Sequence, residues 1–352
     1  MNIEEKVKEY YTKYINKSSD LKTNACCTSS RYPDNIKNLI QNIKEEIQDS
    51  YYGCGLVIPD CLKDCKVLDL GCGTGFDVYL LSQLVTESGE VIGVDMTEKQ
   101  LEIARTHQEW HREKFNYSKS NITFKLGYIE LLDKLNIEEN SMDIVISNCV
   151  INLCQDKERV LQQIYRVLKN GGEFYFSDVY STRRVPDDLR NDKVLWGECL
   201  SGALYWNDFI NLCKKVGFSD VRLVKSNRTT VNNREIEEKL GDIEFYSATY
   251  RLFKLDLEND CEDYGQIVIY KGTIENNTEY WDLDNHHRFY KKKELRVCGN
   301  TWKMLYDTRF RKHFEFRGNF DNHYGIFDGC GKAMPFEDNS CLTNNNNGSK
   351  CC

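Results

Sequence analysis

The sequence predicts an α/β fold in which a doubly wound, mostly parallel sheet is followed by a smaller α+β domain. From Lys66 onward, short apolar runs alternate with helical patterns, which is typical of βαβ units. A glycine-rich turn follows the first apolar run. Beyond about Lys254 the alternation is lost, and a chain of 352 residues is long enough for two hydrophobic cores.

Before the sheet, two helices are predicted, over residues 2–16 and 35–48. The second helix has apolar residues at spacings of three and four, which form one stripe on a helix. These residues are Ile36, Leu39, Ile40, Ile43 and Ile47.

Five apolar runs predict the strands of the sheet, near residues 66–70, 90–95, 121–126, 142–148 and 172–178. After the second strand, Thr97 and Gln100 have the spacing of a capping box, which predicts the start of a helix. Before the fifth strand, a helix is expected to end at residues 169–171 with Gly171 as its stop. Helices near 186–198 and 205–216 follow, with strands near 220–230 and 243–253 that would complete the sheet.

The C-terminal third changes in composition. Residues 262–336 are rich in Tyr, Phe and Trp with short apolar runs, which indicates a small α+β module, and the polar, asparagine-rich end predicts disorder. The expected divisions are an N-terminal helical segment at 1–50, the sheet domain at 51–253, the α+β domain at 254–336 and a cysteine-containing tail at 337–352.

Composition excludes several functional classes. The net charge of -8, without a clustered basic face or an aromatic RNA-binding signature, argues against nucleic-acid binding and favours a small substrate. The N-terminus is charged and lacks the apolar stretch of a secretory signal, and no run of 18 apolar residues occurs. We therefore expect a cytoplasmic protein that does not enter a membrane.

The glycine-rich turn is the strongest local signal. Residues 67–75 read Val-Leu-Asp-Leu-Gly-Cys-Gly-Thr-Gly, with Asp69 in the strand and glycines at Gly71, Gly73 and Gly75. Glycines let a ligand approach the main chain, and open α/β sheets bind ligands at the carboxyl ends of their strands. Asp95 ends the second strand about twenty residues later, where a carboxylate can accept hydrogen bonds from both ribose hydroxyls. An adenosine ligand is therefore predicted.

The details of the turn indicate which adenosine cofactor binds. Phe76 occupies the position where a dinucleotide-binding turn has its third glycine. The G-x-G-x-G form after an acidic residue resembles the class I S-adenosylmethionine-dependent methyltransferases, which have a Rossmann-like sheet and cradle no pyrophosphate. The resemblance implies that Ile129 and Glu130 flank the adenine and that Asn148 lies at the cofactor. A lone glycine turn is otherwise only a tight βα connection.

The sixteen cysteines need to be sorted, because a cytosolic chain does not use them as a disulfide framework. A free cysteine is most often a small buried hydrophobe. No role is assigned to Cys61 and Cys65, which flank the first strand, to Cys213, or to Cys261, Cys298, Cys330 and Cys341, which are scattered without metal-ligand spacing.

Three other cysteines are positioned for chemistry. Cys149 directly follows the fourth strand at its carboxyl end, Cys54 lies in a turn between two glycines, and Cys199 lies on a segment after the fifth strand that can cross the same edge. Three convergent thiolates without a histidine suit a soft, thiophilic centre. Trivalent arsenic binds three sulfurs in a pyramid and keeps a lone pair that can attack a sulfonium methyl without a general base.

At this point the chain resembles a known family, the arsenite S-adenosylmethionine methyltransferases, over roughly residues 20–255. The matching segments are residues 51–59, 95–97, 147–153, 175–180, 196–199 and 202–206.

The resemblance assigns roles to individual residues. It implies that Cys149 and Cys199 hold trivalent arsenic, with Cys54 as the third thiolate. It also implies that Cys26 pairs with Cys54 in a disulfide that restores trivalent arsenic after each transfer and is then reduced by thioredoxin or glutathione. Tyr52 and Met96 would lie beside the cofactor, S-adenosylmethionine.

On this interpretation the substrates are thiol conjugates of arsenite and methylarsenite, and no metal is permanently bound. The products are mono- and dimethylated arsenicals, with a third methylation left open.

The chain departs from the family pattern at several positions, and these positions leave alternatives open. Cys27 adjoins Cys26, so either could be the redox thiol, although Cys26 is the aligned one. Cys72, at the variable position of the glycine turn, is interpreted as a small filler. The region after Lys254 matches the family weakly, and Cys351 and Cys352 either pass arsenic to the pocket or belong to a tail without a role.

Three other functions compete with this interpretation. A methyltransferase for a small organic acceptor would keep its activity without Cys149. A thiol protein that only sequesters metalloid would bind without turnover, which the glycine turn with Asp95 argues against. A zinc site would need short-spaced cysteine pairs, which are missing here.

Overall fold

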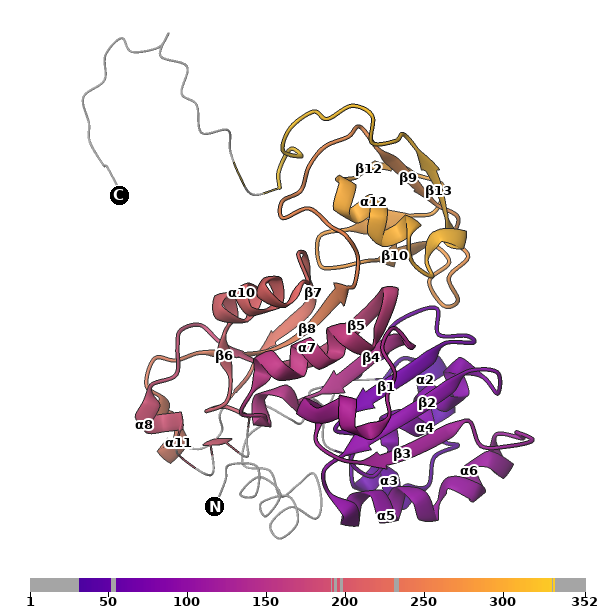
Figure 1. The fold of residues 1–352 in the computed structure, drawn as a ribbon, viewed down its shortest axis with the longest axis vertical. Coiled ribbons are helices and arrows are strands. Elements are labelled where there is room, and N and C mark those ends of the chain that lie inside the picture. The colour runs from indigo at the N-terminus through magenta and orange to yellow at the C-terminus, as the bar shows by residue number, and fades with distance from the viewer. Residues whose placement is uncertain are drawn as a thin grey trace.

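The fold is built around one central sheet (Figure 1). The computed structural model describes residues 32–51, 55–190, 192, 195–196, 199–230, 234–330 and 332. The first five strands are β1 (Lys66–Leu70), β2 (Glu90–Asp95), β3 (Ile122–Leu126), β4 (Met142–Asn148) and β5 (Leu168–Ser181). The short β6 (Leu204–Tyr205) and the longer β7 (Val221–Arg228) and β8 (Phe245–Phe253) come after them in the chain.

The strands lie in the order β3-β2-β1-β4-β5-β8-β7, with β6 paired to β5. Pairing from β3 through β5 is parallel, whereas β8 runs antiparallel to both β5 and β7. The predicted doubly wound, mostly parallel sheet is confirmed, and so are the two strands expected to complete it. The order reverses beside β1, so the carboxyl ends of β1 and β4 form the crevice where ligands bind in such sheets.

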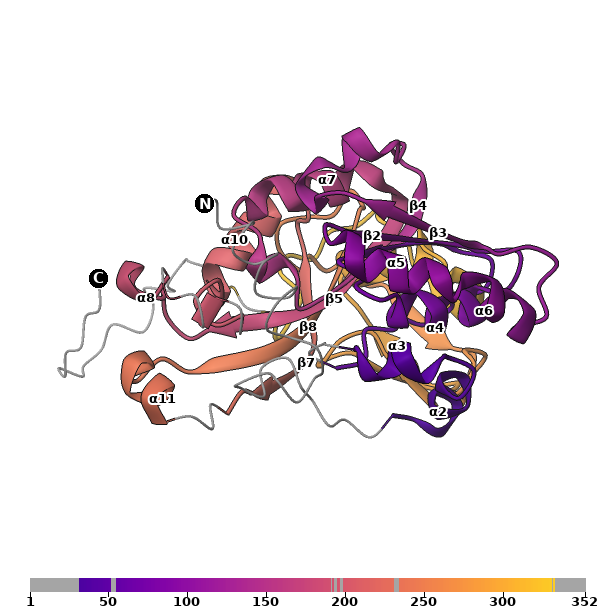
Figure 2. The ribbon, with the colours of Figure 1, turned by 90° about the horizontal axis from the view of Figure 1, so that it is seen from below.

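Helices cover both faces of the sheet (Figure 2). On one face lie α7 (Lys157–Val167), α10 (Trp206–Val216) and the 3-10 helix η2 (Ile129–Leu135). On the other lie α2 (Asp34–Ile40), α3 (Glu45–Asp49), α4 (Phe76–Val85) and α5 (Glu98–Thr106), followed by α6 (Gln108–Lys114). Successive strand residues face opposite layers: Leu68 and Leu70 join one core, and Val67 joins the other.

Two local predictions are wrong and a third is confirmed in part. The helix expected over residues 35–48 is broken into α2 and α3, although Ile36, Ile43 and Ile47 of its stripe are buried. The helix start expected after β2 is confirmed, since Thr97 is the N-cap of α5, but in the described structure its side chain makes no capping bond. Gly171 does not stop a helix, because α7 ends at Val167; its left-handed backbone lies inside the span of β5, where its N–H bonds the Lys254 carbonyl oxygen at 2.8 Å.

Other predictions fall partly or wholly outside the described residues. The helix over residues 2–16 and the tail after residue 336 are among these. Within the range predicted for the helix at 186–198, the structure describes α8 (Asp187–Arg190) and only part of the segment C-terminal to it. The helix and strands expected near 205–216, 220–230 and 243–253 are confirmed as α10, β7 and β8.

The C-terminal region forms separate small sheets, which confirms its predicted α+β class. One sheet pairs β12 (Glu294–Arg296), β9 (Ile267–Tyr270) and β13 (Phe314–Arg317), and the other pairs β10 (Tyr280–Asp282) with β11 (Arg288–Tyr290). Helix α12 (Gly299–Tyr306) packs its buried face into the core of this region. The single turns η3 (Ile151–Leu153) and η4 (Arg311–His313) complete the described elements.

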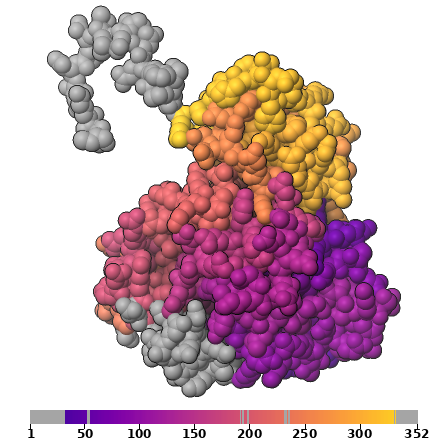
Figure 3. Space-filling model, viewed as in Figure 1, coloured from indigo at the N-terminus to yellow at the C-terminus, as the bar shows by residue number. Residues whose placement is uncertain are grey.

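The C-terminal region sits directly against the sheet domain (Figure 3). Glu173 of β5 is fully buried and pairs with Arg251 of β8 and with Arg309 of the C-terminal region. Arg309 also donates to the backbone oxygen of Asp60, ahead of β1, at 2.8 Å. Among the described residues, no helix is both long enough and apolar enough to cross a membrane.

Candidate active site

The glycine turn opens the crevice at the end of β1. Gly71, Gly73 and Gly75 all have positive φ, at 77°, 52° and 88°. A Cβ on Gly71 would lie 2.4 Å from a methyl carbon of Val150, and one on Gly75 would lie 2.9 Å from the Phe124 ring. By contrast, a Cβ on Gly73 would meet no atom within 4 Å, so main chain is exposed there to an approaching ligand.

Asp95 fixes the shape of this turn from the end of β2. One carboxylate oxygen accepts the N–H of Gly73 at 2.8 Å, and the other accepts the N–H of Thr97 at 2.8 Å. A carboxylate only accepts hydrogen bonds, and each of its oxygens has two lone pairs, which suits it to ligand hydroxyls. Asp95 lines the pocket together with Met96.

A second pair of carboxyl groups lies behind the turn. Asp69 in β1 and Asp77 in α4 are 2% and 6% exposed. One oxygen of each, Oδ2 of Asp69 and Oδ1 of Asp77, is buried without a hydrogen-bond partner. Burial raises the pKa of Asp77 to about 7, and burial, followed by repulsion from Asp77 and Asp95, raises the pKa of Asp69 well above its ordinary value. Two such carboxyls fit a cationic ligand group that would satisfy the orphaned oxygens.

Asn148, at the end of β4, joins this acidic pair to the N-terminal segment. Its amide nitrogen lies 3.2 Å from Oδ2 of Asp77, 2.7 Å from the Tyr51 hydroxyl oxygen and 3.0 Å from the Gly55 carbonyl oxygen. The Tyr51 hydroxyl in turn donates to the Gly55 carbonyl at 2.9 Å. Asn148 therefore holds together segments from three parts of the chain.

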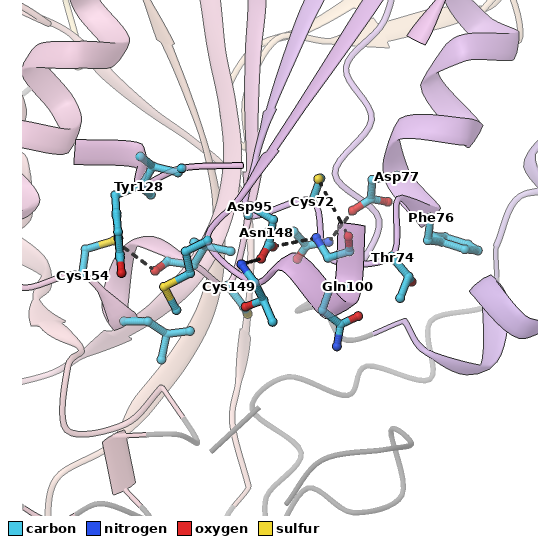
Figure 4. A pocket seen from close by; sticks show the side chains of 18 of the residues that line it. Cys72, Thr74, Phe76, Asp77, Asp95, Gln100, Tyr128, Asn148, Cys149 and Cys154 are labelled. Carbon is cyan, nitrogen blue, oxygen red and sulfur yellow. Dashed lines mark hydrogen bonds between the residues drawn. The ribbon is translucent and has the colours of Figure 1, made fainter. Parts of the chain in front are cut away.

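The remaining wall of the pocket comes from η2 and from the segment after β4. Ile129, Glu130 and Tyr128 line it, with Gln100 of α5, whose buried Oε1 has no hydrogen-bond partner. Figure 4 shows Tyr128, Cys149 and Cys154 on one side of Asn148, and Cys72, Asp77 and Phe76 on the other. The Cys72 sulfur packs so closely on Gly93 that a Cβ there would lie 2.8 Å from it, which fits the interpretation of Cys72 as a filler.

Cys149 and Cys199 are brought together although they are fifty residues apart. The Cys199 thiol donates to the carbonyl oxygen of Cys149 at 3.5 Å, and both residues are buried. Both also adopt the left-handed backbone region, with φ of 57° and 61°. This conformation is costly for a residue with a side chain and is often found where function requires a side chain to be aimed.

The segment that carries Cys149 is held in place by buried polar contacts. Asp178 of β5 accepts the Asn152 N–H at 3.1 Å, and the Asn152 amide donates to the Val179 carbonyl at 2.6 Å. Burial raises the pKa of Asp178 to about 6, although the hydrogen bonds that its carboxylate accepts from the backbone N–H groups of Val179 and Asn152 oppose the rise. Lys157 donates to the carbonyls of Asn152 and Cys154, at 3.2 and 2.7 Å.

Gly202 completes the contact between the two cysteine segments. A Cβ on this residue would lie 2.0 Å from the Asn152 carbonyl oxygen, so only glycine lets the chain after Cys199 approach the chain after Cys149.

Three predicted site residues, Cys26, Tyr52 and Cys54, lie outside the described residues. Cys149 itself is disulfide-bonded. Nine described cysteines, Cys199 among them, form no disulfide.

Several pocket residues escaped the sequence analysis. Asp77 lies in a helix two residues after the glycine turn, where an acidic residue also suits a helix N-terminus and gives no distinct signal. Cys154 lines the pocket, and burial, followed by the nearby Glu130, raises the pKa of its thiol well above the ordinary range. Its position after Asn152, in the turn that follows β4, was the available signal. Asp178 and Lys157 form hydrogen bonds with backbone groups of the segment after β4, and such contacts leave no pattern in the sequence.

Comparison with known proteins now decides the family. An arsenite methyltransferase from Aquipseudomonas alcaligenes is 52% identical to this chain over 340 residues, which cover 96% of this chain and 98% of that protein. This chain belongs to the arsenite methyltransferase family. It is therefore an S-adenosylmethionine-dependent enzyme that methylates arsenic.

Further comparisons extend the match to most of the chain. The human arsenite methyltransferase is 46% identical over 316 residues, 90% of this chain and 84% of that protein. The crystal structure of an arsenic(III) S-adenosylmethionine methyltransferase from Chlamydomonas reinhardtii superposes with a TM-score of 0.82 at 47% identity, covering 85% of this chain and all of that one.

Two domain families also match. The family described as a methyltransferase domain matches residues 62–217, and the arsenite methyltransferase C-terminal domain matches residues 264–352. The expected weak match after Lys254 is thus wrong, because short strands and scattered aromatic residues gave little to recognise there. In the described part of the chain, no cluster of three or more His, Cys, Asp or Glu side chains is arranged to hold a metal ion.

Proposed function

We propose that this arsenite methyltransferase holds trivalent arsenic with the thiolates of Cys54, Cys149 and Cys199. The observation that carries the proposal is the meeting of Cys149 and Cys199, both with left-handed backbone, beside the end of β4. Cys149 lines the same pocket as Asp77, Asp95 and Asn148, so an arsenic atom on its sulfur would face the cofactor site. Trivalent arsenic prefers sulfur ligands, and no histidine is among the described residues that line the pocket.

The cofactor is assigned to the glycine-turn side of the pocket. S-adenosylmethionine supplies an electrophilic methyl group and carries an ammonium, a carboxylate and an adenosine. The orphaned oxygens of Asp69 and Asp77 fit the ammonium, and the carboxylate of Asp95, an acceptor at the end of β2, fits the ribose hydroxyls. We assign Ile129 and Glu130 to the two sides of the adenine, and Met96 and Tyr52 to positions beside the cofactor. Gly71, Gly73, Gly75 and Asn148 would shape the rest of this site.

The protein residues need little acid–base chemistry for the transfer itself. Three thiolates would hold the arsenic so that its lone pair points toward the methyl group, and orientation of this kind is itself a large part of catalysis. Forming the carbon–arsenic bond uses the lone pair and leaves the arsenic pentavalent. Cys26 and Cys54 would return two electrons to the arsenic and become a disulfide.

The resulting disulfide needs an external reductant, which we assign to thioredoxin or glutathione. Cys149 is disulfide-bonded in the structure, so it too must be reduced before its thiolate can bind arsenic. Repetition of the cycle on arsenite and then methylarsenite, presented as thiol conjugates, gives mono- and dimethylated arsenicals. We also propose the division at residues 50, 253 and 336, with the arsenic site in the domain spanning 51–253.

Product analysis tests this assignment. Full-length protein is supplied with arsenite, labelled S-adenosylmethionine and either thioredoxin or glutathione, and the arsenic species are separated by chromatography. We expect Cys149→Ser and Cys199→Ser to abolish transfer to arsenite and to methylarsenite alike. Cys213→Ser, a buried free thiol on α10, is the matched control and should keep its activity. Activity that survives in Cys149→Ser would contradict the proposal.

The redox roles assigned to Cys26 and Cys54 are tested by asking which methylation step each serine variant loses. Cys26→Ser and Cys54→Ser should lose methylation of arsenite but keep methylation of supplied methylarsenite, because methylarsenite already carries one carbon and needs only two thiolates, which Cys149 and Cys199 supply. Cys27→Ser is the control for Cys26→Ser. If Cys27→Ser fails and Cys26→Ser does not, the redox role belongs to Cys27.

A further inference from the structure

A second pair of cysteines lies in the C-terminal region, and neither member takes part in the chemistry proposed above. Cys261 follows β8, and Cys298 directly precedes α12. Their backbones are held side by side, because the N–H of Gly299 bonds the carbonyl of Glu262 at 2.9 Å. The carbonyl of Cys261 accepts the N–H of Phe327 at 2.7 Å, which fixes the other side of the segment. This backbone contact places Cys261 and Cys298 on neighbouring segments, and each thiol affects the titration of the other.

Cys298 receives several donors at once. It is the N-cap of α12, and its sulfur accepts the N–H of Thr301 at 3.4 Å. The Thr301 hydroxyl lies 3.3 Å from the same sulfur, and the Arg222 guanidinium lies 4.0 Å away. A helix N-terminus and a neighbouring arginine are both features that stabilise a thiolate. The donors from Thr301 and Arg222 therefore surround the Cys298 sulfur.

Arg222 is itself held rigidly. It is 7% exposed and donates to Asp220 at 2.6 and 2.7 Å, to Asp284 at 3.1 Å and to the Thr301 hydroxyl at 3.2 Å. His287 also contacts this group, since its Nδ1 lies 2.8 Å from Asp284. Two carboxylates offset the arginine charge, so stabilisation of a thiolate at Cys298 depends on the donors aimed at the sulfur.

The titration of the pair follows this arrangement. The neighbouring Cys261 side chain lowers the pKa of Cys298 most, Arg222 and Thr301 lower it further, and burial opposes them. The Cys298 side chain, followed by burial, raises the pKa of Cys261. Cys298 is 1% exposed whereas Cys261 is partly exposed, so an incoming molecule must be small and must enter past Cys261.

This pair is remote from the arsenic site along the sheet. Strand β8 begins at Phe245, paired with Ser181 near the Asp178 end of β5, and finishes at Phe253, paired with Glu173. The chain leaves β8 at that end and continues through Cys261 to β9, and β9 and α12 belong to the C-terminal region (Figure 1). Cys261 therefore cannot act as a direct ligand of arsenic held at Cys149.

We propose that Cys298 and Cys261 form a peroxide-sensitive dithiol, in which Cys298 is the attacking thiolate and Cys261 is the resolving thiol. The Cys298 sulfur attacks one oxygen of a small hydroperoxide; a sulfur–oxygen bond forms, the oxygen–oxygen bond breaks, and the leaving alkoxide or hydroxide takes a proton from water. The peroxide is reduced by two electrons and Cys298 becomes a sulfenic acid. The Cys261 sulfur then attacks the Cys298 sulfur, and the hydroxyl group leaves as water with the proton of Cys261. The resulting disulfide ties the segment after β8 to α12.

Peptide mapping tests the proposal on the full-length, reduced protein. Hydrogen peroxide is added at pH 7, free thiols are alkylated, and the digest is analysed by mass spectrometry. We expect a linked peptide pair joining Cys261 to Cys298, which a thiol reductant removes. An ordinary thiol is only a few per cent thiolate at pH 7, so the link should form roughly tenfold faster than Cys213 is oxidised. Between pH 7.5 and 6.5 the rate should change less than about twofold, whereas an unperturbed thiol loses roughly tenfold.

Two variants separate the roles of the thiols. In Cys261→Ser the link should vanish and a cyclic 1,3-dione probe should label Cys298, whose sulfenic acid has lost its resolving partner. Cys330→Ser, another free cysteine of this region, should leave the link unchanged. Unaltered arsenite methylation by Cys261→Ser shows that the variant is folded. The proposal is overturned if Cys298 stays reduced while Cys213 is oxidised, or if Cys298 links to Cys330 instead.

Discussion

At the scale of single residues, Asp77 makes cofactor binding dependent on pH. Burial raises its pKa to about 7 in the cofactor-free protein, and a carboxyl must lose its proton to bind an ammonium. We therefore predict that the dissociation constant of S-adenosylmethionine falls as the pH rises from 6 to 8. Calorimetric titration in buffers of different ionisation enthalpy would measure both the affinity and the proton released.

The control for this prediction is Asp77→Asn, which cannot titrate. It should bind S-adenosylmethionine roughly 10- to 100-fold more weakly at pH 8, because a charge-assisted hydrogen bond contributes about 1.5–3 kcal/mol, and its affinity should depend less steeply on pH, because Asp69 alone of the pair still titrates. An equally steep pH profile in the variant would assign the titration to another group.

The same carboxyl affects the stability of the cofactor-free protein. Its pKa is raised above the unfolded value of 3.8, so the folded protein binds this proton more tightly than the unfolded chain does. The stabilising contribution is fully present below that unfolded value and is lost as the pH rises through about 7. Urea unfolding of wild type and Asp77→Asn between pH 4 and 8 should show a difference that grows with pH, in favour of the variant. A constant difference would contradict the assignment.

At the scale of elements, the contact between the segments after Cys149 and after Cys199 depends on Gly202. The Gly202→Ala change would bring a Cβ to 2.0 Å from the Asn152 carbonyl, and backbone cannot yield as a flexible side chain does. We predict destabilisation of about 1–3 kcal/mol and a loss of methylation of roughly 100-fold, since small displacements of reacting groups are costly. S-adenosylmethionine affinity should change little.

Gly241→Ala is the matched control for this change. Gly241 has positive φ, at 57°, and among the described residues an added Cβ there meets no atom within 4 Å, whereas the change at Gly202 acts through the contact with Asn152. The Gly241 change should cost about 1–2 kcal/mol through backbone strain and keep methylation. Equal loss of activity in both variants would mean that lower stability, and not the contact between the cysteine segments, decides.

Helices and strands could be predicted from the sequence where a single apolar pattern ran through the whole segment. The strands β1 to β4 were found from apolar runs, and their alternation with helices predicted the parallel sheet and hence which strand ends would meet. Residues that require long-range contacts were not predictable. The break between α2 and α3 interrupts a regular apolar stripe, and the left-handed turn at Gly171 is set by Lys254, more than eighty residues away.

The candidate site shows the same division. The glycine turn, Asp95 and Asn148 lie at strand ends, where the fold itself predicts that they converge. Asp77, Cys154 and Asp178 were missed because their roles come from burial and from partners distant in sequence. The pair formed by Cys261 and Cys298 has no sequence signature either, since 37 residues separate its members and Arg222 comes from β7.

At the scale of the whole molecule, one buried charge cluster ties the C-terminal region to the sheet. Glu173 neutralises Arg251, which is 2% exposed, and also pairs with Arg309. We predict that Glu173→Gln lowers the free energy of unfolding by about 3–5 kcal/mol, because Arg251 keeps its buried charge without a counterion. Denaturant unfolding would measure it.

Glu90→Gln provides the comparison for that measurement. Glu90 pairs with Lys66 on the exposed surface, so its loss should cost less than about 1 kcal/mol. Similar values for the two variants would argue against the cluster as the link between the regions.

The central claim is that Cys149 and Cys199 are ligands of arsenic, and X-ray absorption at the arsenic edge tests it most directly. Full-length reduced protein is loaded with one equivalent of arsenite, with no other thiol present. The account predicts arsenic bound by sulfur alone, with oxygen entering the coordination shell in Cys149→Ser and in Cys199→Ser but not in Cys213→Ser. An unchanged all-sulfur shell in both Cys149→Ser and Cys199→Ser would contradict it.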